Sequence, residues 1–170
     1  MIQRMVRSAK LDPHLYEEVE ADTGAMSQAL IIVAIVALIT AVGVSRGGIG
    51  DALLGIVLGI VGWALWAAIT YFVGAKLLPT PQTHADWGQM LRVLGFAQSV
   101  GVLRVLGVIP GVGALLLFIV LLWQIAAMVV AVRQALDYTS TLRAVAVVII
   151  GAIPYMVLLF LLSGLEPAAA

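Results

Sequence analysis

The residue types best suited to chemistry gather near the N-terminus, in the stretch LDPHLYEEVEAD at residues 11–22. His14 precedes Glu17 and Glu18 by three and four residues, which would place an imidazole and a carboxylate on one face of a helix, as in a metal pair. The chain has no cysteine, and its second histidine, His84, has no catalytic spacing to another group. Because a metal shell would stay incomplete, we interpret His14 as a surface histidine among solvated acids and expect no bound metal.

Nucleophilic catalysis in the apolar part of the chain would need a serine with a nearby base. Ser99, Ser140 and Ser163 have no histidine at the same depth, and the sequence contains neither paired aspartates in an apolar segment nor an HExxH motif. We therefore expect no catalytic residue, no cofactor and no enzymatic activity.

Four of the charged residues within or next to the apolar segments are candidate interfacial charges, and function is sought there first because charge is costly in a membrane. Arg133 and Asp137 are four residues apart and are expected to pair at a helix end, as an interfacial device rather than a transport site. Arg92 and Arg104 are 12 residues apart, about 18 Å along a helix, so each can reach one membrane surface. We favour snorkelling to the surfaces for both arginines, and binding of a substrate or lipid headgroup is the alternative.

The composition is that of an integral membrane protein. Hydrophobic residues make up 63% of the chain and charged residues 11%, and the mean hydropathy of +1.14 exceeds what a soluble domain could bury. Apolar stretches of about 20 residues predict an all-α, polytopic fold of transmembrane helices rather than a barrel. Nine cationic and nine acidic residues balance, so no basic surface favours nucleic acid binding. The five predicted spans are residues 25–44, 51–78, 90–109, 113–132 and 144–163, followed by a short tail at 164–170.

The third predicted span has alternatives. Asp86 and Gln89 predict a helix start with a capping box, yet Arg92, Arg104 and several glycines interrupt the apolar pattern that follows. This segment could cross the membrane, re-enter it or lie at the interface.

The positive charges predict the orientation. With five spans, seven cations fall on one side, and Arg46 and Arg104 fall on the other, which places the N-terminus in the cytoplasm. The seven are Arg4, Arg7, Lys10, Lys76, Arg92, Arg133 and Arg143. A third segment that did not cross would reverse the sides of the later loops and weaken this asymmetry, so five spans are preferred.

Residues 1–24 form a polar segment before the first span. Asp12, which is followed by proline, is a suitable N-cap for a short helix. Leu11, Leu15 and Val19 recur at helical spacing while the acids face elsewhere, so we predict an amphipathic helix at the cytoplasmic interface. Its apolar face is a candidate surface for a partner or for packing, and its net negative charge opposes adsorption to anionic lipid.

A strip of glycines in the second span is a candidate packing surface. Gly55, Gly59 and Gly62 are spaced so that another helix can approach closely. We favour packing within the chain over contact with a second subunit.

Three tryptophans lie near the middle of their spans, away from the interfaces that tryptophan usually prefers. They are Trp63, Trp66 and Trp123. We expect them to fill the bundle core with their indole N–H groups bonded to residues such as Gln98 or Gln124; contact with a hydrophobic ligand or partner is the alternative.

Four segments together carry a resemblance to a known family. They are LDPHLYEEVEAD before the first span, GWALWAAITYFVGAKL in the second, LRVLGFAQSVGVLRVLGVIPGVG around the third, and LLWQIAAMVVAVRQALDYTSTLRA from the fourth to the fifth. In order and spacing they resemble bacterial members of the YIP (Ypt-interacting protein) family over nearly the whole chain. The resemblance implies five membrane helices with a cytoplasmic N-terminus, in a bacterial inner (cytoplasmic) membrane.

The resemblance implies a fold more than an activity. Eukaryotic members of the family bind prenylated Rab-type GTPases and shape vesicle traffic, whereas the bacterial members have no agreed biochemical activity. Val100 stands where the family pattern would place a proline after the GFAQ-type segment, which argues against a kink or unwound turn in the third helix.

The function predicted from these observations is that of a non-enzymatic membrane scaffold or accessory subunit. Its expected partners are membrane lipid and another integral membrane protein or a second copy of itself, with no nucleic acid. A small transporter or channel-like protein for an ion or lipid is the alternative, although five spans cannot divide into two equal inverted repeats.

Overall fold

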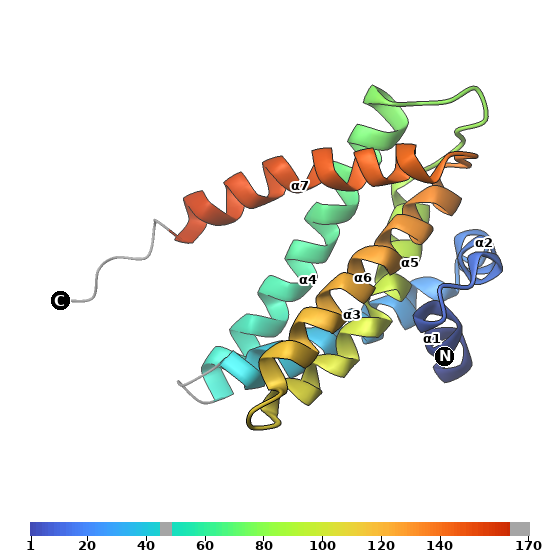
Figure 1. The fold of residues 1–170 in the computed structure, drawn as a ribbon. Coiled ribbons are helices and arrows are strands. Elements are labelled where there is room, and N and C mark those ends of the chain that lie inside the picture. The colour runs from blue at the N-terminus through green and yellow to red at the C-terminus, as the bar shows by residue number, and fades with distance from the viewer. Residues whose placement is uncertain (45–48, 164–170) are drawn as a thin grey trace.

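The computed structural model describes residues 1–44 and 49–163, and all regular secondary structure in these ranges is helical, which confirms the all-α fold (Figure 1). The elements are α1 (Ile2–Ala9), α2 (Pro13–Ala21), α3 (Ala25–Val44), α4 (Ile49–Tyr71), the π-helix η1 (Phe72–Leu77), α5 (Trp87–Ala97), the 3-10 helix η2 (Gln98–Val108), α6 (Gly113–Ala135) and α7 (Thr141–Ser163). The predicted tail at 164–170 and the predicted outer cation Arg46 lie outside the described residues.

Four helical segments in the described ranges are long and apolar enough to cross a membrane. They are α3, α4 continued by η1, α5 continued by η2, and α6. In α7 the apolar stretch that is described, Thr141–Val157, is shorter. The chain is therefore a multi-pass membrane protein, and a fifth crossing by α7 stays a prediction.

The third segment begins at the predicted cap. Asp86 Oδ1 accepts a hydrogen bond from the Gln89 backbone N–H at 2.8 Å, and the Asp86 N–H donates to Gln89 Oε1 at 2.5 Å, which completes the capping box. At Gln98 the α-helix changes to the tighter 3-10 winding of η2. The presence of Val100 in place of a proline argued against such a change in the third helix, and that prediction is wrong. A turn at Gly111, whose φ of +81° favours glycine, then leads into α6.

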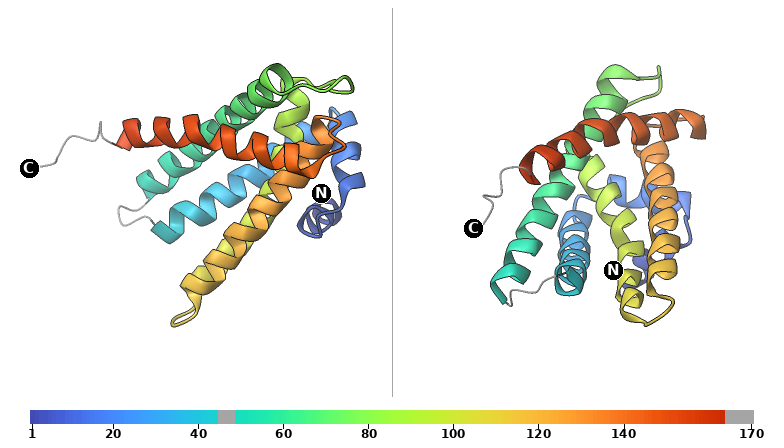
Figure 2. Two further views of the ribbon diagram at one scale, coloured as in Figure 1. Left: turned by 45° about the horizontal axis from the view of Figure 1, so that its top comes forward. Right: turned by 60° about the vertical axis from the view of Figure 1, so that its left-hand side comes forward.

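The membrane segments α3, α4, α5 with η2, and α6 form a bundle (Figures 1 and 2). At one end, α2 meets the loop at 78–86 and the turn at 136–140, and we call this the α2 end. The side chain of Thr83 donates to the Leu136 carbonyl there at 3.0 Å. The opposite end holds the turn at 109–112 between η2 and α6. Helix α7 starts at the α2 end, packs on α4 and α6, and runs away from the other helices in its later part (Figures 1 and 2).

The predicted N-terminal helix exists as α2, and Asp12 caps it by accepting a hydrogen bond from the His14 N–H at 3.0 Å. Its apolar face does not lie free at an interface, because Leu15 and Val19 are completely buried where α2 packs on α5 and α6. Leu11, in the turn before α2, packs against the same core and is partly buried. Leu15 and Val19 therefore serve internal packing and are not accessible to a partner.

Helix α1 was not predicted. Its Ser8 is completely buried and donates through Oγ to the Phe96 carbonyl at 2.7 Å. At the C-terminal end of α1, the Ala9 carbonyl accepts a hydrogen bond from the Trp123 indole N–H at 2.7 Å. These contacts hold α1 against α5, η2 and α6.

The glycine strip packs within the chain. A Cβ atom built on Gly55 would lie 2.6 Å from Ala41 Cβ, and one built on Gly59 would lie 2.5 Å from Ala37 Cβ. Only glycine therefore permits the present approach of α4 to α3. Gly62 faces α7, where its Cβ would lie 3.0 Å from the Tyr155 hydroxyl oxygen.

Candidate binding cavity within the bundle

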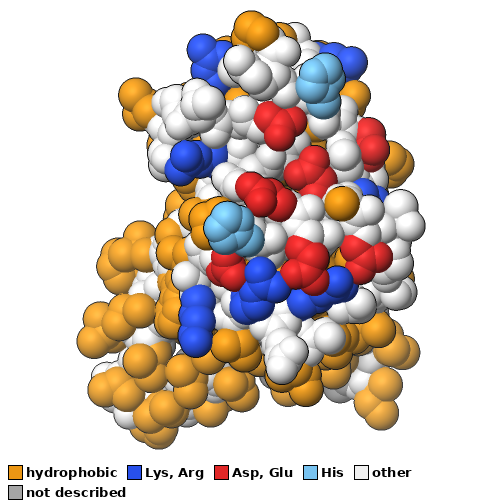
Figure 3. Space-filling view, turned by 90° about the vertical axis from the view of Figure 1, so that its right-hand side faces the viewer, with side chains coloured by type: hydrophobic (Ala, Val, Ile, Leu, Met, Phe, Trp, Pro, Cys, Tyr) orange, Lys and Arg blue, Asp and Glu red, His pale blue; other side chains and the backbone are white. Residues whose placement is uncertain are grey.

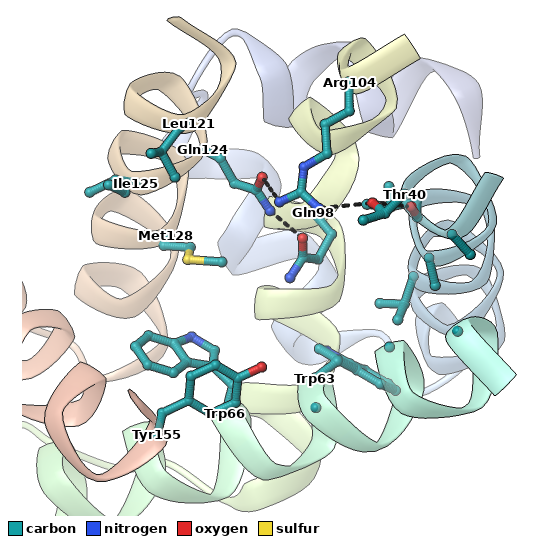
Figure 4. A pocket seen from close by; sticks show the side chains of 17 residues that line it. Thr40, Trp63, Trp66, Gln98, Arg104, Leu121, Gln124, Ile125, Met128 and Tyr155 are labelled. Carbon is teal, nitrogen blue, oxygen red and sulfur yellow. Dashed lines mark hydrogen bonds between the residues drawn. The ribbon is translucent and has the colours of Figure 1, made fainter. Parts of the chain in front are cut away.

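A cavity of about 500 Å³ lies inside the bundle between α3, α4, η2, α6 and α7 (Figure 4). Its volume is within the range of about 300–1,000 Å³ that small-molecule sites occupy. Most of its wall is apolar, and a few polar side chains converge at one place. This combination makes it the leading candidate for a binding site in the described part of the chain.

The polar groups of the cavity form one connected network. Arg104 donates to Thr40 Oγ1 at 3.0 Å and to Gln124 Oε1 at 2.8 Å, and the Gln124 amide in turn donates to Gln98 Oε1. Figure 4 shows the Arg104 side chain entering the cavity from η2 toward α3 and α6. The prediction that Arg104 snorkels to the membrane surface is therefore wrong, because side chains of the bundle supply its hydrogen-bond acceptors.

Aromatic side chains form the other part of the cavity. Trp63 is 6% exposed and Trp66 is 8% exposed, as expected for tryptophans of the bundle core. Trp66 meets the Tyr155 ring edge to face, with 5.4 Å between the ring centroids. The expected hydrogen bonds to glutamine are absent: both buried indole N–H groups lack an acceptor among the described residues.

Trp123 does not fill the core. It is 38% exposed on α6, and its indole N–H reaches the Ala9 carbonyl of α1. The position of Trp123 in the middle of a span gave no sign of this contact, because α1 was not predicted and lies far away in the sequence.

A second polar region covers the α2 end. Figure 3 shows acidic, basic and histidine side chains gathered on the face that carries α1 and α2, above a surface that is mostly hydrophobic. Arg4 pairs with Glu18 at 2.7 Å and with Asp22 at 2.9 Å, and Arg7 pairs with Asp12 at 2.7 Å and with Glu18 at 2.6 Å. Hydrogen bonds from these arginines hold the pKa values of the three carboxyl groups below their ordinary values. The network ties α1 to α2.

Arg92, near the start of the third segment, is 7% exposed, and its side chain binds the backbone of α2. Its Nε donates to the Val19 carbonyl at 3.0 Å, and its Nη2 donates to the Glu20 carbonyl. These carbonyls belong to the last turn of α2, where no helical N–H remains to bind them. The predicted snorkelling of Arg92 is therefore wrong, and its charge is used to dock α2.

The Glu20 side chain lies close to this contact. Partial burial raises the pKa of Glu20 from 4.5 to about 7, and the negative charge of Asp137 adds to the rise while Arg92 opposes it. Glu20 therefore changes its charge near neutral pH.

The predicted pair of Arg133 and Asp137 does not form. Arg133 donates to the Tyr138 carbonyl and to Thr141 Oγ1, both at 3.2 Å, and so holds the turn into α7. Asp137 accepts a hydrogen bond from the His84 backbone N–H at 3.4 Å. With a φ of +52°, Asp137 leaves the helical path, which removes the i, i+4 geometry on which the prediction depended.

The histidine near the N-terminus stays at the surface. The His14 side chain is 83% exposed, and its Nδ1 lies 3.4 Å from Glu17 Oε2. Within residues 1–44 and 49–163, no group of three His, Cys, Asp or Glu residues is arranged to hold a metal ion.

Comparison with known families agrees with this architecture: the Yip1 domain matches residues 12–162. The chain belongs to the Yip1 domain family. It is a family of membrane proteins and is not known as an enzyme family. The match begins after α1, so α1 lies outside the matched region. No curated protein and no solved structure shows significant similarity to the chain.

Sequence reasoning identified Arg104 and the tryptophans but did not bring them together in a cavity. Thr40, Gln98 and Gln124 are uncharged polar residues on three mainly apolar segments, and this was the available signal. Uncharged polar residues inside membrane helices tend to bond across helices, so their combination with an arginine on the third segment could have indicated the network.

Proposed function

We propose that this Yip1 domain protein is a non-enzymatic scaffold or accessory subunit of a larger membrane complex, with its N-terminus in the cytoplasm of a bacterium. The observation that carries the proposal is the charged face at the α2 end. It is built on a fixed support, since Leu15 and Val19 are fully buried and Arg92 binds the last turn of α2. A face held in this way is preorganised, so binding does not have to order it.

The distribution of cations supports the orientation. All seven cations assigned to one side of the membrane belong to α1, to segments that end or begin at the α2 end, or to the turns there: Arg4, Arg7, Lys10, Lys76, Arg92, Arg133 and Arg143. Arg104 lies on η2, toward the opposite end. Lysine and arginine in short loops are retained on the cytoplasmic side, so the α2 end is assigned to the cytoplasm.

A hollow on the charged face offers a docking place. It lies between α2, the loop at 78–86 and the turn at 136–140, and Glu17, His84 and Asp137 are among its lining residues. These side chains present acceptors and donors together, which fits a polar protein surface better than the anionic surface of a bilayer. The partner proposed is another integral membrane protein or a second copy of this chain.

Co-purification from mild detergent tests the proposal at native expression level. We expect Glu17→Lys to lose the partner that the unchanged chain retains, because the substitution reverses a charge in the hollow. Gln3→Lys places a lysine at an exposed position of α1, outside the hollow, and should retain the partner. Equal recovery with both variants would exclude the hollow as the docking surface, and a chain that purifies alone would contradict the accessory role.

Removing α2 would be a poor test. Deletion of residues 1–22 would also remove Leu15, Tyr16 and Val19 from the bundle core. Point substitutions on the exposed surface keep this support in place.

The transport alternative has one observation in its favour, the internal cavity.

A further inference from the structure

The cavity holds a cation whose hydrogen-bond partners are neutral. Arg104 donates to a threonine hydroxyl and to a glutamine amide oxygen, and no carboxylate of the described residues forms an ion pair with it. A guanidinium has more N–H donors than these two hydrogen bonds use. A partly buried charge is normally paired, so a guanidinium without a carboxylate partner favours an anionic ligand.

Two buried tryptophans line the same cavity. The indole N–H groups of Trp63 and Trp66 are buried and have no partner among the described residues, although buried donors are nearly always bonded. Figure 4 shows the Trp66 indole and the Tyr155 hydroxyl facing the space that the Arg104 network enters from the other side. The indole rings of both tryptophans therefore give the cavity wall a broad apolar surface.

The rest of the wall requires an apolar ligand portion. Val33, Val36 and Met128 line the cavity together with the tryptophan rings. Leu121 and Ile125 also line it, and they are 51% and 42% exposed, so the α6 wall continues into the outer, lipid-facing surface. A hydrocarbon chain could therefore enter sideways from the bilayer.

The positions of Arg104 and Trp66 along the bundle indicate how a bound ligand is oriented. Arg104 precedes the end of η2 at Val108 by four residues, about 8 Å at the rise of a 3-10 helix. This places its charge near the end of the bundle opposite to α2, where lipid headgroups would be close. Trp66 lies deeper, about halfway along the continuous segment from Ile49 to Leu77.

The structure argues against an ion pathway through the same cavity. The lining includes no residue of α5, and Met90, Leu94 and Phe96 of that helix are completely buried in the apolar core. The polar lining therefore stops inside the bundle, whereas a conduction path would need polar groups or water from end to end.

We propose that the cavity binds an anionic amphiphile from the bilayer, with its headgroup oxygens at Arg104 and its hydrocarbon chain along Trp63, Trp66 and Met128. A carboxylate of a free fatty acid and a phosphate of an acidic phospholipid share this chemistry. The ligand stays in the bundle as a bound lipid, and its site is separate from the charged hollow at the α2 end.

Tryptophan quenching by brominated lipids tests the proposal in the full-length chain, purified in an uncharged detergent. Trp87 and Trp123 are 50% and 38% exposed, so both are replaced by Phe and the fluorescence comes from Trp63 and Trp66 alone. We expect saturable quenching by dibromostearate, by brominated phosphatidylglycerol or by both, and at least about tenfold weaker quenching by brominated phosphatidylcholine. Quenching by only one anionic compound identifies the source of the ligand. Equal quenching by all three compounds, or none by any, would refute the proposal.

The charge of Arg104 is tested in the same background. Arg104→Gln removes the charge that would bind the headgroup, so it should weaken binding of the anionic compound by at least about tenfold. Arg104→Lys keeps the charge and should retain the preference for the anionic over the zwitterionic lipid. Loss of this preference in both variants while the thermal unfolding midpoint is unchanged, or unaltered binding in Arg104→Gln, would contradict the role of the cation. If Arg104→Gln does not fold, the preference of the unsubstituted arginine chain for anionic lipid still decides the matter.

Discussion

Replacement of Gly59 by alanine should destabilise the bundle, although alanine is the better helix former. The added Cβ would lie 2.5 Å from Ala37 Cβ and 3.5 Å from Ala37 Cα. A Cβ atom is fixed to its backbone and cannot turn aside as the end of a long side chain can. The substitution therefore forces α4 and α3 apart, and it loosens the contacts on both sides of this crossing.

The magnitude follows from two opposing effects. Forcing an extra methyl group into a packed interface costs about 1–3 kcal/mol. Alanine returns up to about 1 kcal/mol through helix propensity. With a contact as short as 2.5 Å, we expect a net loss of about 2 kcal/mol in the free energy of unfolding.

Two other glycines of α4 provide a graded control. Nothing lies within 4 Å of a Cβ built on Gly50, so Gly50→Ala should leave stability unchanged or raise it slightly. At Gly62 the nearest atom is the Tyr155 hydroxyl oxygen at 3.0 Å, the far end of a side chain, so Gly62→Ala should have an intermediate effect.

Reversible unfolding by dodecyl sulfate in mixed micelles, followed by tryptophan fluorescence, measures the three variants against the unsubstituted chain. The expected order of stability is Gly50→Ala, then Gly62→Ala, then Gly59→Ala. If Gly59→Ala were as stable as Gly50→Ala, the close approach of α4 to α3 would be wrong.

Labelling, titration and a turn substitution test other parts of the structure. Single cysteines at His14 and Val112 should react with an impermeant thiol reagent from opposite sides of the membrane; reaction from one side only would contradict a third segment that crosses. The pKa of Glu20 is 4.5 in its ordinary state and about 7 in the folded chain, so folding favours the protonated form. The contribution of Glu20 to stability should therefore be greatest below about pH 4.5 and be lost as the pH rises through 7, and Glu20→Gln should remove this part of the pH dependence in unfolding curves recorded at several pH values. Asp137→Asn should change the free energy of unfolding by well under about 1 kcal/mol, because asparagine also tolerates a positive φ. Asp137→Val should lower the free energy of unfolding by at least about 1–2 kcal/mol.

The parts of the fold that follow local rules could be predicted from the sequence. The first span was placed at residues 25–44, which are the bounds of α3. Asp12 and Asp86 were recognised as caps because an N-cap acts within three residues of itself. The glycine strip of α4 was assigned to internal packing, since small residues on one helix face permit close approach whatever the partner is.

The parts that depend on distant contacts could not be predicted in this way. Arg92 and Arg104 were both expected to reach for the membrane surface, because sequence spacing gives the depth of a residue but not its neighbours. The carbonyls of α2 that receive Arg92 are more than 70 residues away in the chain, and the Gln124 acceptor of Arg104 is 20 residues away on another helix. The pair of Arg133 and Asp137 failed for a local reason, the left-handed turn at Asp137.

The arginines at the two ends of the bundle differ in the groups that they bind. At the α2 end, Arg4 and Arg7 are neutralised by carboxylates, and Arg92 completes the last turn of a helix. Their hydrogen bonds hold the architecture together. Arg104 also has neutral acceptors, but its side chain lines the cavity, where a ligand can reach its charge. The proposed binding chemistry of the bundle therefore lies at the end opposite to the charged docking face.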